Sequence, residues 1–192
     1  MLNRRAELQE MLGDIEKAIE LQKQAIALNP LQASGYVLLG GYLYEAGRYE
    51  EANGVLQKAL ELNPQHAFIH AGLGIILLAQ GHPQEALAEI QQETADSVRL
   101  QDEALAYYDL GRRQESDATL RELIAAYAND SAFQIAEVYA YRGEVDKAIQ
   151  WLDRAYQQHD SGLTDLKSDP LFKGLHQNPR YIELLKKMRP PS

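Results

Sequence analysis

A period of 34 residues restricts the fold of this sequence more than any other feature. Gly13, Gly47 and Gly81 follow one another at intervals of 34 residues. An alanine stands five residues after each of them, and the dipeptide Asn29-Pro30 recurs as Asn63-Pro64 at the same interval. Self-similarity at such a period is typical of a stack of small structural units, each of which packs only against its neighbours.

The residues of one unit predict two helices joined by a short turn. In the second unit, apolar and small residues recur with helical spacing from Tyr36 to Leu43, which predicts a helix over residues 33–45. Gly47 is expected to end this helix, because glycine adopts the left-handed backbone conformation at low cost. A second helix is predicted over residues 49–62. It stops at Asn63, because the following proline disfavours helix at the preceding residue.

Small residues recur where the two helices of each unit are expected to cross. Two helices joined by a short turn must pack closely, and a large side chain at the crossing would overpack it at a cost of about 1–3 kcal/mol. The small residues of the first helices are Gly40, Gly74, Ala104 and Ala136, and those of the second helices are Ala18, Ala52, Ala86, Ser116 and Ala148.

This pattern resembles the tetratricopeptide repeat. The second unit has all of its characteristic positions: Tyr36, Leu39, Gly40, Leu43, Gly47, Ala52, Ala59 and Pro64. The third unit departs from the pattern at His70, Glu93 and Val98, where an aromatic residue, an alanine and a proline are usual. The resemblance covers about residues 2–157. It implies an all-α fold, a right-handed superhelix of tandem helix-turn-helix repeats with C-terminal capping helices.

The repeats and the chain ends predict the domain organisation. We expect an array over residues 1–157, divided into 1–30, 31–64, 65–96, 97–128 and 129–157, followed by capping helices over 158–192. Within the last part, Ser168-Asp169-Pro170 and Asn178-Pro179 are helix-start signals. The first helix, residues 2–12, begins partway into the repeat pattern. It is either a divergent N-terminal cap or, as we favour, the start of a piece of a longer protein.

The sequence from Phe133 onward has a narrower resemblance. It is similar to the C-terminal repeat region of bacterial multidomain signalling proteins, in which a nucleotide-cyclase, kinase, winged-helix or TolB-like module precedes the repeats. None of those modules is present here. The resemblance implies a regulatory or sensory arm.

Composition excludes several classes of function. The formal net charge is −9, which disfavours binding to nucleic acid phosphates. The chain has no cysteine, so disulfides and thiolate metal sites are excluded. No apolar run reaches the roughly 18 residues that a membrane span needs, and residues 1–10 lack the apolar stretch of a signal peptide. We therefore expect no membrane insertion and a cytoplasmic protein.

No constellation of residues indicates catalysis. His66 and His70 are four residues apart, as zinc ligands on one helix can be, but no further ligand accompanies them. Carboxylates such as Glu50 and Glu51 lie at the starts of second helices, where they suit the helix dipole. The isolated glycines form no phosphate-binding loop. We therefore predict no catalytic residue, no metal and no cofactor.

A second set of apolar residues remains on the first helices after the packing positions are assigned. Apolar side chains left over on one face indicate a contact surface, and we predict that they form a concave groove for a peptide or protein partner. The predicted groove residues are Val37, Tyr44, Phe68, Ile75, Leu78, Leu105, Tyr108, Phe133 and Tyr141.

The residues at the inner positions of the groove restrict the kind of partner. Some tetratricopeptide-repeat proteins clamp a partner's terminal carboxylate with lysine, arginine and asparagine; the matching positions here hold Val37, Gly41, Ala71 and Ile75. Binding of that kind is therefore not expected. The chain's own C-terminal segment or a second copy of the protein, through self-association, is the alternative occupant of the groove.

Overall fold

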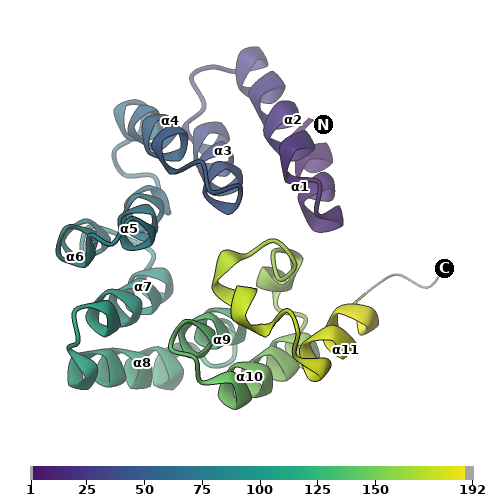
Figure 1. Cartoon of the computed structure of the whole chain (residues 1–192). Helices are drawn as coiled ribbons and strands as arrows, with labels where there is room; N and C mark the ends of the chain where they lie inside the picture. Colours follow the sequence, from purple (N-terminus) through teal and green to yellow (C-terminus); the bar gives the residue numbers. More distant parts are fainter. Residues whose placement is uncertain (1, 189–192) are drawn as a thin grey trace.

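The chain forms a curved array of antiparallel helix pairs. The computed structural model describes residues 2–188, and these contain helices and turns but no strand. In Figure 1 the helices α3, α5, α7 and α9 lie toward the inside of the curve, and their partners lie outside. The five pairs are α1 (Leu2–Leu12) with α2 (Ile15–Leu28), α3 (Ala33–Glu45) with α4 (Tyr49–Leu62), α5 (Ile69–Ala79) with α6 (Pro83–Ile90), α7 (Asp96–Asp109) with α8 (Arg113–Tyr127), and α9 (Ala132–Tyr141) with α10 (Val145–Gln158).

The predicted helices of the second unit have the bounds of α3 and α4, so the repeat was read in the correct register. The glycine in the turn of every pair has a positive φ, from +71° to +81°. An L-residue with a side chain is strained in this region, whereas glycine is not. The backbone conformation thus explains why glycine recurs at these turns.

Close packing within each pair depends on the small residues predicted for the crossings. Ala18, Ala52, Ala86 and Ala148 are fully buried. A Cβ atom added to Gly40 would lie 2.7 Å from Leu56 Cδ2 on the partner helix. In the fourth pair, the buried Ser116 hydroxyl donates a hydrogen bond to the carbonyl oxygen of Ala104, 2.5 Å away. The small side chains at these crossings therefore allow the two helices of a pair to pack closely.

The C-terminal segment, residues 159–188, both caps the array and turns back into its curve. It contains η1 (Ser161–Thr164), η2 (Pro170–Leu175) and α11 (Pro179–Lys187). Asp169 caps η2 and Asn178 caps α11, as the helix-start signals predicted. Figure 1 shows that α11 follows α10 at the end of the array, whereas η1 and η2 lie inside the curve. A simple end cap, as the sequence suggested, is therefore only part of this segment's role.

Apolar contacts hold the C-terminal segment against α9. The ring of Phe172 is fully buried and its centroid lies 5.2 Å from that of Phe133. The hydroxyl of the buried Tyr181 donates a hydrogen bond to the carbonyl oxygen of Leu166. At the other end of the array, Lys167 Nζ donates to the carbonyl oxygen of Leu12, 2.6 Å away. The segment thus connects the last helix pair to the first.

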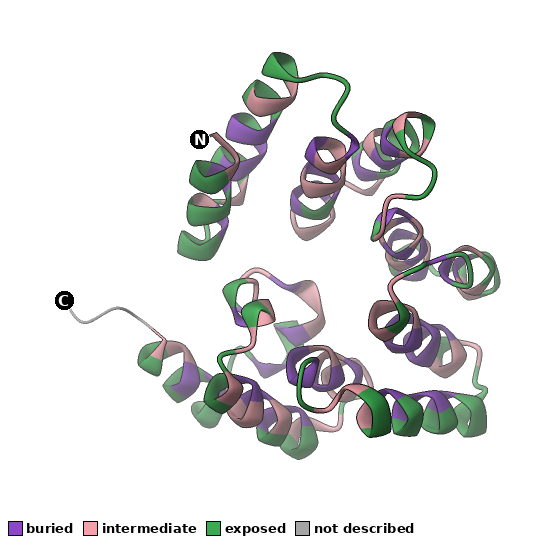
Figure 2. Ribbon diagram, turned by 180° about the vertical axis from the view of Figure 1, so that it is seen from behind, coloured by how far each residue is buried: buried purple, intermediate pink, exposed green. Residues whose placement is uncertain are grey.

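The buried residues follow the interfaces between neighbouring helices along the whole curve (Figure 2). They form three apolar clusters, which belong to the first pairs, the middle pairs, and the last pair with the C-terminal segment. None of the helices described is long and apolar enough to cross a membrane.

The glycines on these helices make the packing argument testable. A Cβ at Gly74 would collide with Ile90 Cγ1 and would lie 3.4 Å from the backbone oxygen of Ala86, whereas a Cβ at Gly54 would meet nothing within 4 Å. Overpacking costs about 1–3 kcal/mol, and alanine in place of helical glycine contributes about 0.5–1 kcal/mol. We expect Gly74→Ala to lower the free energy of unfolding and Gly54→Ala to raise it. Urea denaturation of both variants measures the difference, and equal stabilities would contradict the packing model.

Candidate binding site

A cavity of about 260 Å³ lies between the inner helices and the C-terminal segment. Residues of α3, α5, α7 and α9 line it, and residues 165–171 close one side. We call it the concave cavity. The four positions at which related proteins clamp a carboxylate, Val37, Gly41, Ala71 and Ile75, all line it. The repeat geometry therefore brings these four positions to one place, and none of them has a polar side chain.

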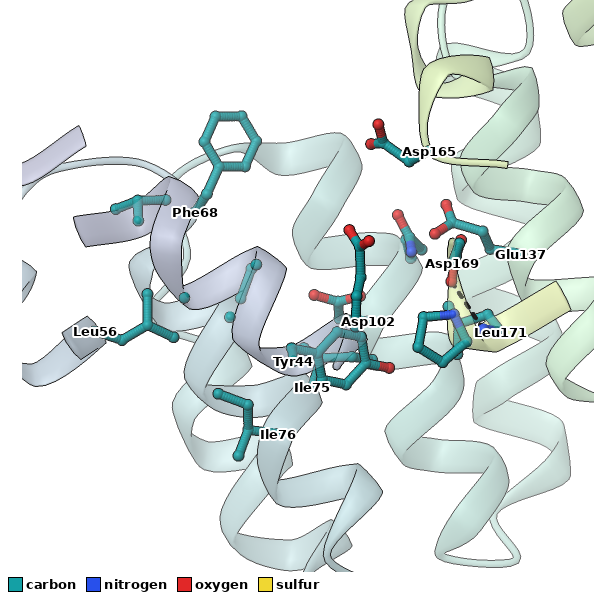
Figure 3. A pocket seen from close by; sticks show the side chains of 18 of the residues that line it. Tyr44, Leu56, Phe68, Ile75, Ile76, Asp102, Glu137, Asp165, Asp169 and Leu171 are labelled. Carbon is teal, nitrogen blue, oxygen red and sulfur yellow. Dashed lines mark hydrogen bonds between the residues drawn. The ribbon is translucent and has the colours of Figure 1, made fainter. Parts of the chain in front are cut away.

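One wall of the concave cavity is apolar. Val37 and Tyr44 contribute to it from α3, and Ile75 and Ile76 contribute from α5. Phe68 precedes α5, and half of its side-chain surface is exposed to solvent. In Figure 3 the apolar side chains of Phe68, Leu56 and Ile76 lie on the side away from the carboxyl groups.

Phe68 has an unusual backbone conformation for a bulky residue. Its φ is +71°, in the left-handed region, where an L-residue costs about 1–2 kcal/mol. Its N–H donates to Glu93 Oε2 at 2.9 Å, and the same carboxylate accepts the N–H groups of Ala71, Thr94 and Ala95. The buried Glu93 carboxylate, at a position where the repeat pattern usually has alanine, thus fixes the backbone at Phe68.

The opposite wall of the concave cavity is acidic. Figure 3 shows the carboxyl groups of Glu137, Asp165 and Asp169 close together, with Asp102 between them and the apolar Tyr44 and Ile75. No lysine, arginine or histidine is among the cavity's lining residues in the described part of the chain. We call the five acidic lining residues the cavity carboxylates: Glu45, Asp102, Glu137, Asp165 and Asp169.

Burial raises the pKa values of these groups, because desolvation disfavours the charged form. It raises the pKa of Glu45 to about 7 and that of Asp169 to about 6. Burial, with the nearby Glu93 carboxylate, raises the pKa of Asp102 well above its usual range. The pKa of Glu137 is also well above its usual range, through burial and the neighbouring Asp169. Next to the cavity, burial and the charge of Glu45 raise the pKa of Glu10 to about 9.

The nine predicted groove residues do not form one surface. Val37, Tyr44, Phe68, Ile75 and Phe133 line the concave cavity. Tyr44 and Ile75 also line an adjacent depression, together with Leu78 and Tyr141.

Three of the nine predicted groove residues, Tyr108, Leu105 and Phe133, have environments that differ from an open apolar surface. Tyr108 lies in a polar depression beside Arg113 and Arg142, whose guanidinium groups face its ring. Leu105 is fully buried in the middle apolar cluster, and Phe133 is 3% exposed because the C-terminal segment covers it. Leu105, which was predicted as a groove residue, is thus a core residue between helix pairs in the structure.

The acidic wall was not predicted, although the repeat register contains a partial signal. Glu137 stands six residues before its turn glycine, as Gly41 and Ile75 do in their units. Gln101 stands ten residues before its turn glycine, as Val37 does. Both therefore occupy inner positions of first helices. Asp165 and Asp169 come from outside the repeats, and no periodicity could have placed them.

The described residues contain no group of three or more histidine, cysteine or carboxylate side chains arranged to hold a metal ion. His70, one of the two histidines with helical spacing, instead forms a 2.7 Å contact between its Nδ1 and Glu89 Oε1. The site is thus a partly apolar, partly acidic cavity.

Sequence comparison with protein families matches three stretches of the chain to tetratricopeptide-repeat models. The matched residues are 1–30, 43–99 and 102–162. No curated protein sequence matches the chain.

Solved structures with similar folds include tetratricopeptide-repeat proteins. TTC0263, a thermophilic protein of this type from Thermus thermophilus, is 19% identical; the alignment covers 96% of this chain and 97% of that one, with a TM-score of 0.69. PilW, described as a widely conserved type IV pilus biogenesis factor, is 16% identical over 95% and 88% of the chains, with a TM-score of 0.62. YrrB, described as having an unusual peptide-binding site, is 20% identical over 87% and 89%, with a TM-score of 0.51. At these identities the likeness shows the fold.

The raised pKa values predict how stability changes with pH. The folded protein retains protons on Glu10 and Glu45 up to about pH 9 and pH 7, whereas the ordinary pKa of a glutamate side chain is 4.5. Between these values the folded state binds more protons than the unfolded state, so the contribution of both groups to stability falls as pH rises. We expect the double variant Glu10→Gln, Glu45→Gln to lose less stability than the wild type between pH 5 and pH 8.

Urea denaturation across this pH range measures that contribution. Glu50→Gln, at a position in the first turn of α4 that is remote from the cavity lining, is the matched control and should follow the wild type. Parallel pH profiles of the double variant and the wild type would show that Glu10 and Glu45 ionise normally in the folded protein.

Proposed function

Because this chain belongs to the tetratricopeptide-repeat family, we propose that it is a non-catalytic interaction module that binds a peptide or protein partner at the concave cavity. Four inner helices, from four different repeats, contribute to this cavity. A partner bound there would contact most of the array at once, so the binding surface depends on the stacking of the whole protein.

Phe68 is the observation that supports this proposal most directly. Its side chain is 50% exposed at the edge of the cavity, and its backbone is held in a strained conformation by Glu93. A half-exposed aromatic ring contributes little to the core, so the fold gains little in return for this strain. Strained residues of this kind cluster at ligand-binding sites, and aromatic residues are enriched among those that dominate binding energy.

The size of the cavity indicates how a partner would bind. A volume of about 260 Å³ accommodates one or two side chains rather than a whole helix. The C-terminal segment occupies the α9 side of the concave face, so the partner approaches from the side of Phe68. The adjacent depression, which Tyr44, Ile75 and Tyr141 line above the buried Leu78, extends the apolar surface for the rest of the partner. YrrB, a protein of similar fold, is described as having a peptide-binding site, which supports a peptide as the kind of partner.

A regulatory arm of a larger bacterial signalling protein is the second candidate function. The apolar side chains of Leu8, Met11 and Leu12 on α1 are about half exposed, which favours contact with another domain. An upstream continuation of the reading frame that encodes a cyclase, kinase or DNA-binding module would support this candidate. A reading frame that starts at Met1 would leave the free interaction module.

If Phe68 serves binding rather than stability, its replacement should weaken peptide binding without lowering the free energy of unfolding. Asparagine tolerates the left-handed conformation, so we expect Phe68→Asn to leave the free energy of unfolding unchanged or to raise it by up to about 1 kcal/mol. Peptides selected with the wild-type protein from a random display library should bind the variant at least about tenfold more weakly. Urea denaturation and fluorescence-anisotropy titration measure the two effects.

Leu28→Asn is the control for this experiment. Leu28 is 79% exposed at the end of α2 and does not line the concave cavity. Its substitution should leave peptide affinity unchanged. If Phe68→Asn and the wild type bind the selected peptides equally well, the partner does not use the concave cavity. A protein that selects no peptide at all would contradict the proposed function itself.

A further inference from the structure

The concave cavity has a charge imbalance that nothing in the described structure corrects. Five carboxylates line it, and no cationic side chain does. Lys167 lies between Asp165 and Asp169 in the sequence, but its Nζ donates to the carbonyl oxygen of Leu12 at 2.6 Å. The cation that the chain could most readily supply is therefore engaged in another contact, where it joins the two ends of the array.

Two buried polar side chains in the cavity have no partner within residues 2–188. Asp102 is 4% exposed and Gln101 is 7% exposed. Among the described residues, no hydrogen bond or ion pair involves the side chain of either residue, although both line the cavity. The side-chain atoms of both residues reach the space of the cavity, and near them the buried Oε2 of Glu45 has no hydrogen-bond partner in the described part of the chain. Two such groups on consecutive residues of α7 indicate that the cavity is built for a ligand with hydrogen-bond donors.

The composition of the walls identifies the kind of cation. The carboxylates are not arranged to hold a metal ion, as judged over the described part of the chain. The ring of Tyr44 and the side chain of Ile75 lie opposite the acidic groups, so a ligand that spans the cavity meets apolar surface along its length and carboxyl groups at its end. Lysine and arginine side chains have this construction, with an aliphatic stem and a charged head.

We propose that the concave cavity binds a basic side chain of a partner peptide, with its stem against Tyr44 and Ile75 and its charged head beside Asp102. This inference rests on the proposed function and specifies the chemistry of the partner. The head would donate hydrogen bonds to Asp102 and Gln101, and it would neutralise charge on the other cavity carboxylates. The net charge of −9 would also attract a basic peptide over longer distances.

Proton release is a second consequence of this binding mode. Burial raises the pKa values of the cavity carboxylates, so the free protein retains protons that a cation would displace. Helix α5 contributes no ionisable side chain to the cavity lining. The ionisable groups that act on the site from the other elements are Glu10 on α1, Tyr44 and Glu45 on α3, Glu93 after α6, Asp102 on α7, Glu137 on α9, and Asp165 and Asp169 in the C-terminal segment.

The peptides selected from the random display library test this inference. We expect them to share a lysine or arginine beside apolar residues. Replacement of that basic residue by norleucine, which keeps the stem and removes the charge, should weaken binding to the wild type at least about tenfold. Calorimetric titration in buffers of different ionisation enthalpy should show proton release for the basic peptide and not for the norleucine peptide.

Asp102→Asn identifies the group that the charged head contacts. Asparagine has the shape of a protonated aspartate, so the variant should fold as the wild type does. The loss of affinity caused by norleucine should be at least about threefold smaller in this variant than in the wild type. Asp146→Asn is the matched control, because Asp146 lies in the first turn of α10 and does not line the cavity. In this variant norleucine should weaken peptide binding as much as it does in the wild type.

The results separate the two proposals. If the selected peptides require Phe68 but contain no basic residue, or if they tolerate norleucine, the proposal that the cavity binds a basic side chain is wrong. The proposed function would remain in place. Equal norleucine effects in the wild type and Asp102→Asn would overturn the contact with Asp102. Selection of no peptide at all would overturn both proposals.

Discussion

The close approach of two helices within each pair is the constraint on which the rest of the structure depends. At the crossings the side chains are absent or very small, and the neighbouring residues Leu56 and Ile90 fill the space against Gly40 and Gly74. A single pair buries too little apolar surface to be stable alone, so each pair must pack on the next. The curvature of the stack, and with it the concave cavity, is a consequence of these contacts.

The sequence could predict this part of the fold because it is local and repeated. The turn glycines, the bounds of α3 and α4, and the capping residues Asp169 and Asn178 all follow from rules that act within a few residues. The concave cavity is different, because it joins α3 to residues more than a hundred positions later. Its acidic wall includes Asp165 and Asp169, whose position is set by the packing of Phe172 against Phe133 rather than by the repeat.

Residues that depart from the repeat pattern are the ones that shape the concave cavity. Glu93 replaces a small residue near the end of the third unit, and α6 is only eight residues long. Its carboxylate accepts hydrogen bonds from both sides of the interface between α5 and α7, and it holds Phe68 in its strained conformation. Leu105 departs in a different way, since it is fully buried, whereas Gly41 at the same place in its unit is exposed. Local rules cannot distinguish these cases, because tertiary contacts decide them.

Two opposing effects act on the position of the C-terminal segment. Its apolar residues, such as Phe172 and Leu166, are fully buried, which favours its position against α9. Its carboxylates Asp165 and Asp169 lie near Glu137 and other acidic groups, and this raises the cost of ionising them. A cation in the concave cavity would reduce the second effect without changing the first. By thermodynamic linkage, a ligand that stabilises this position of the segment is itself bound more tightly when the segment is in place. In the binding mode that we propose, the segment would therefore be part of the site and not a substitute for the ligand.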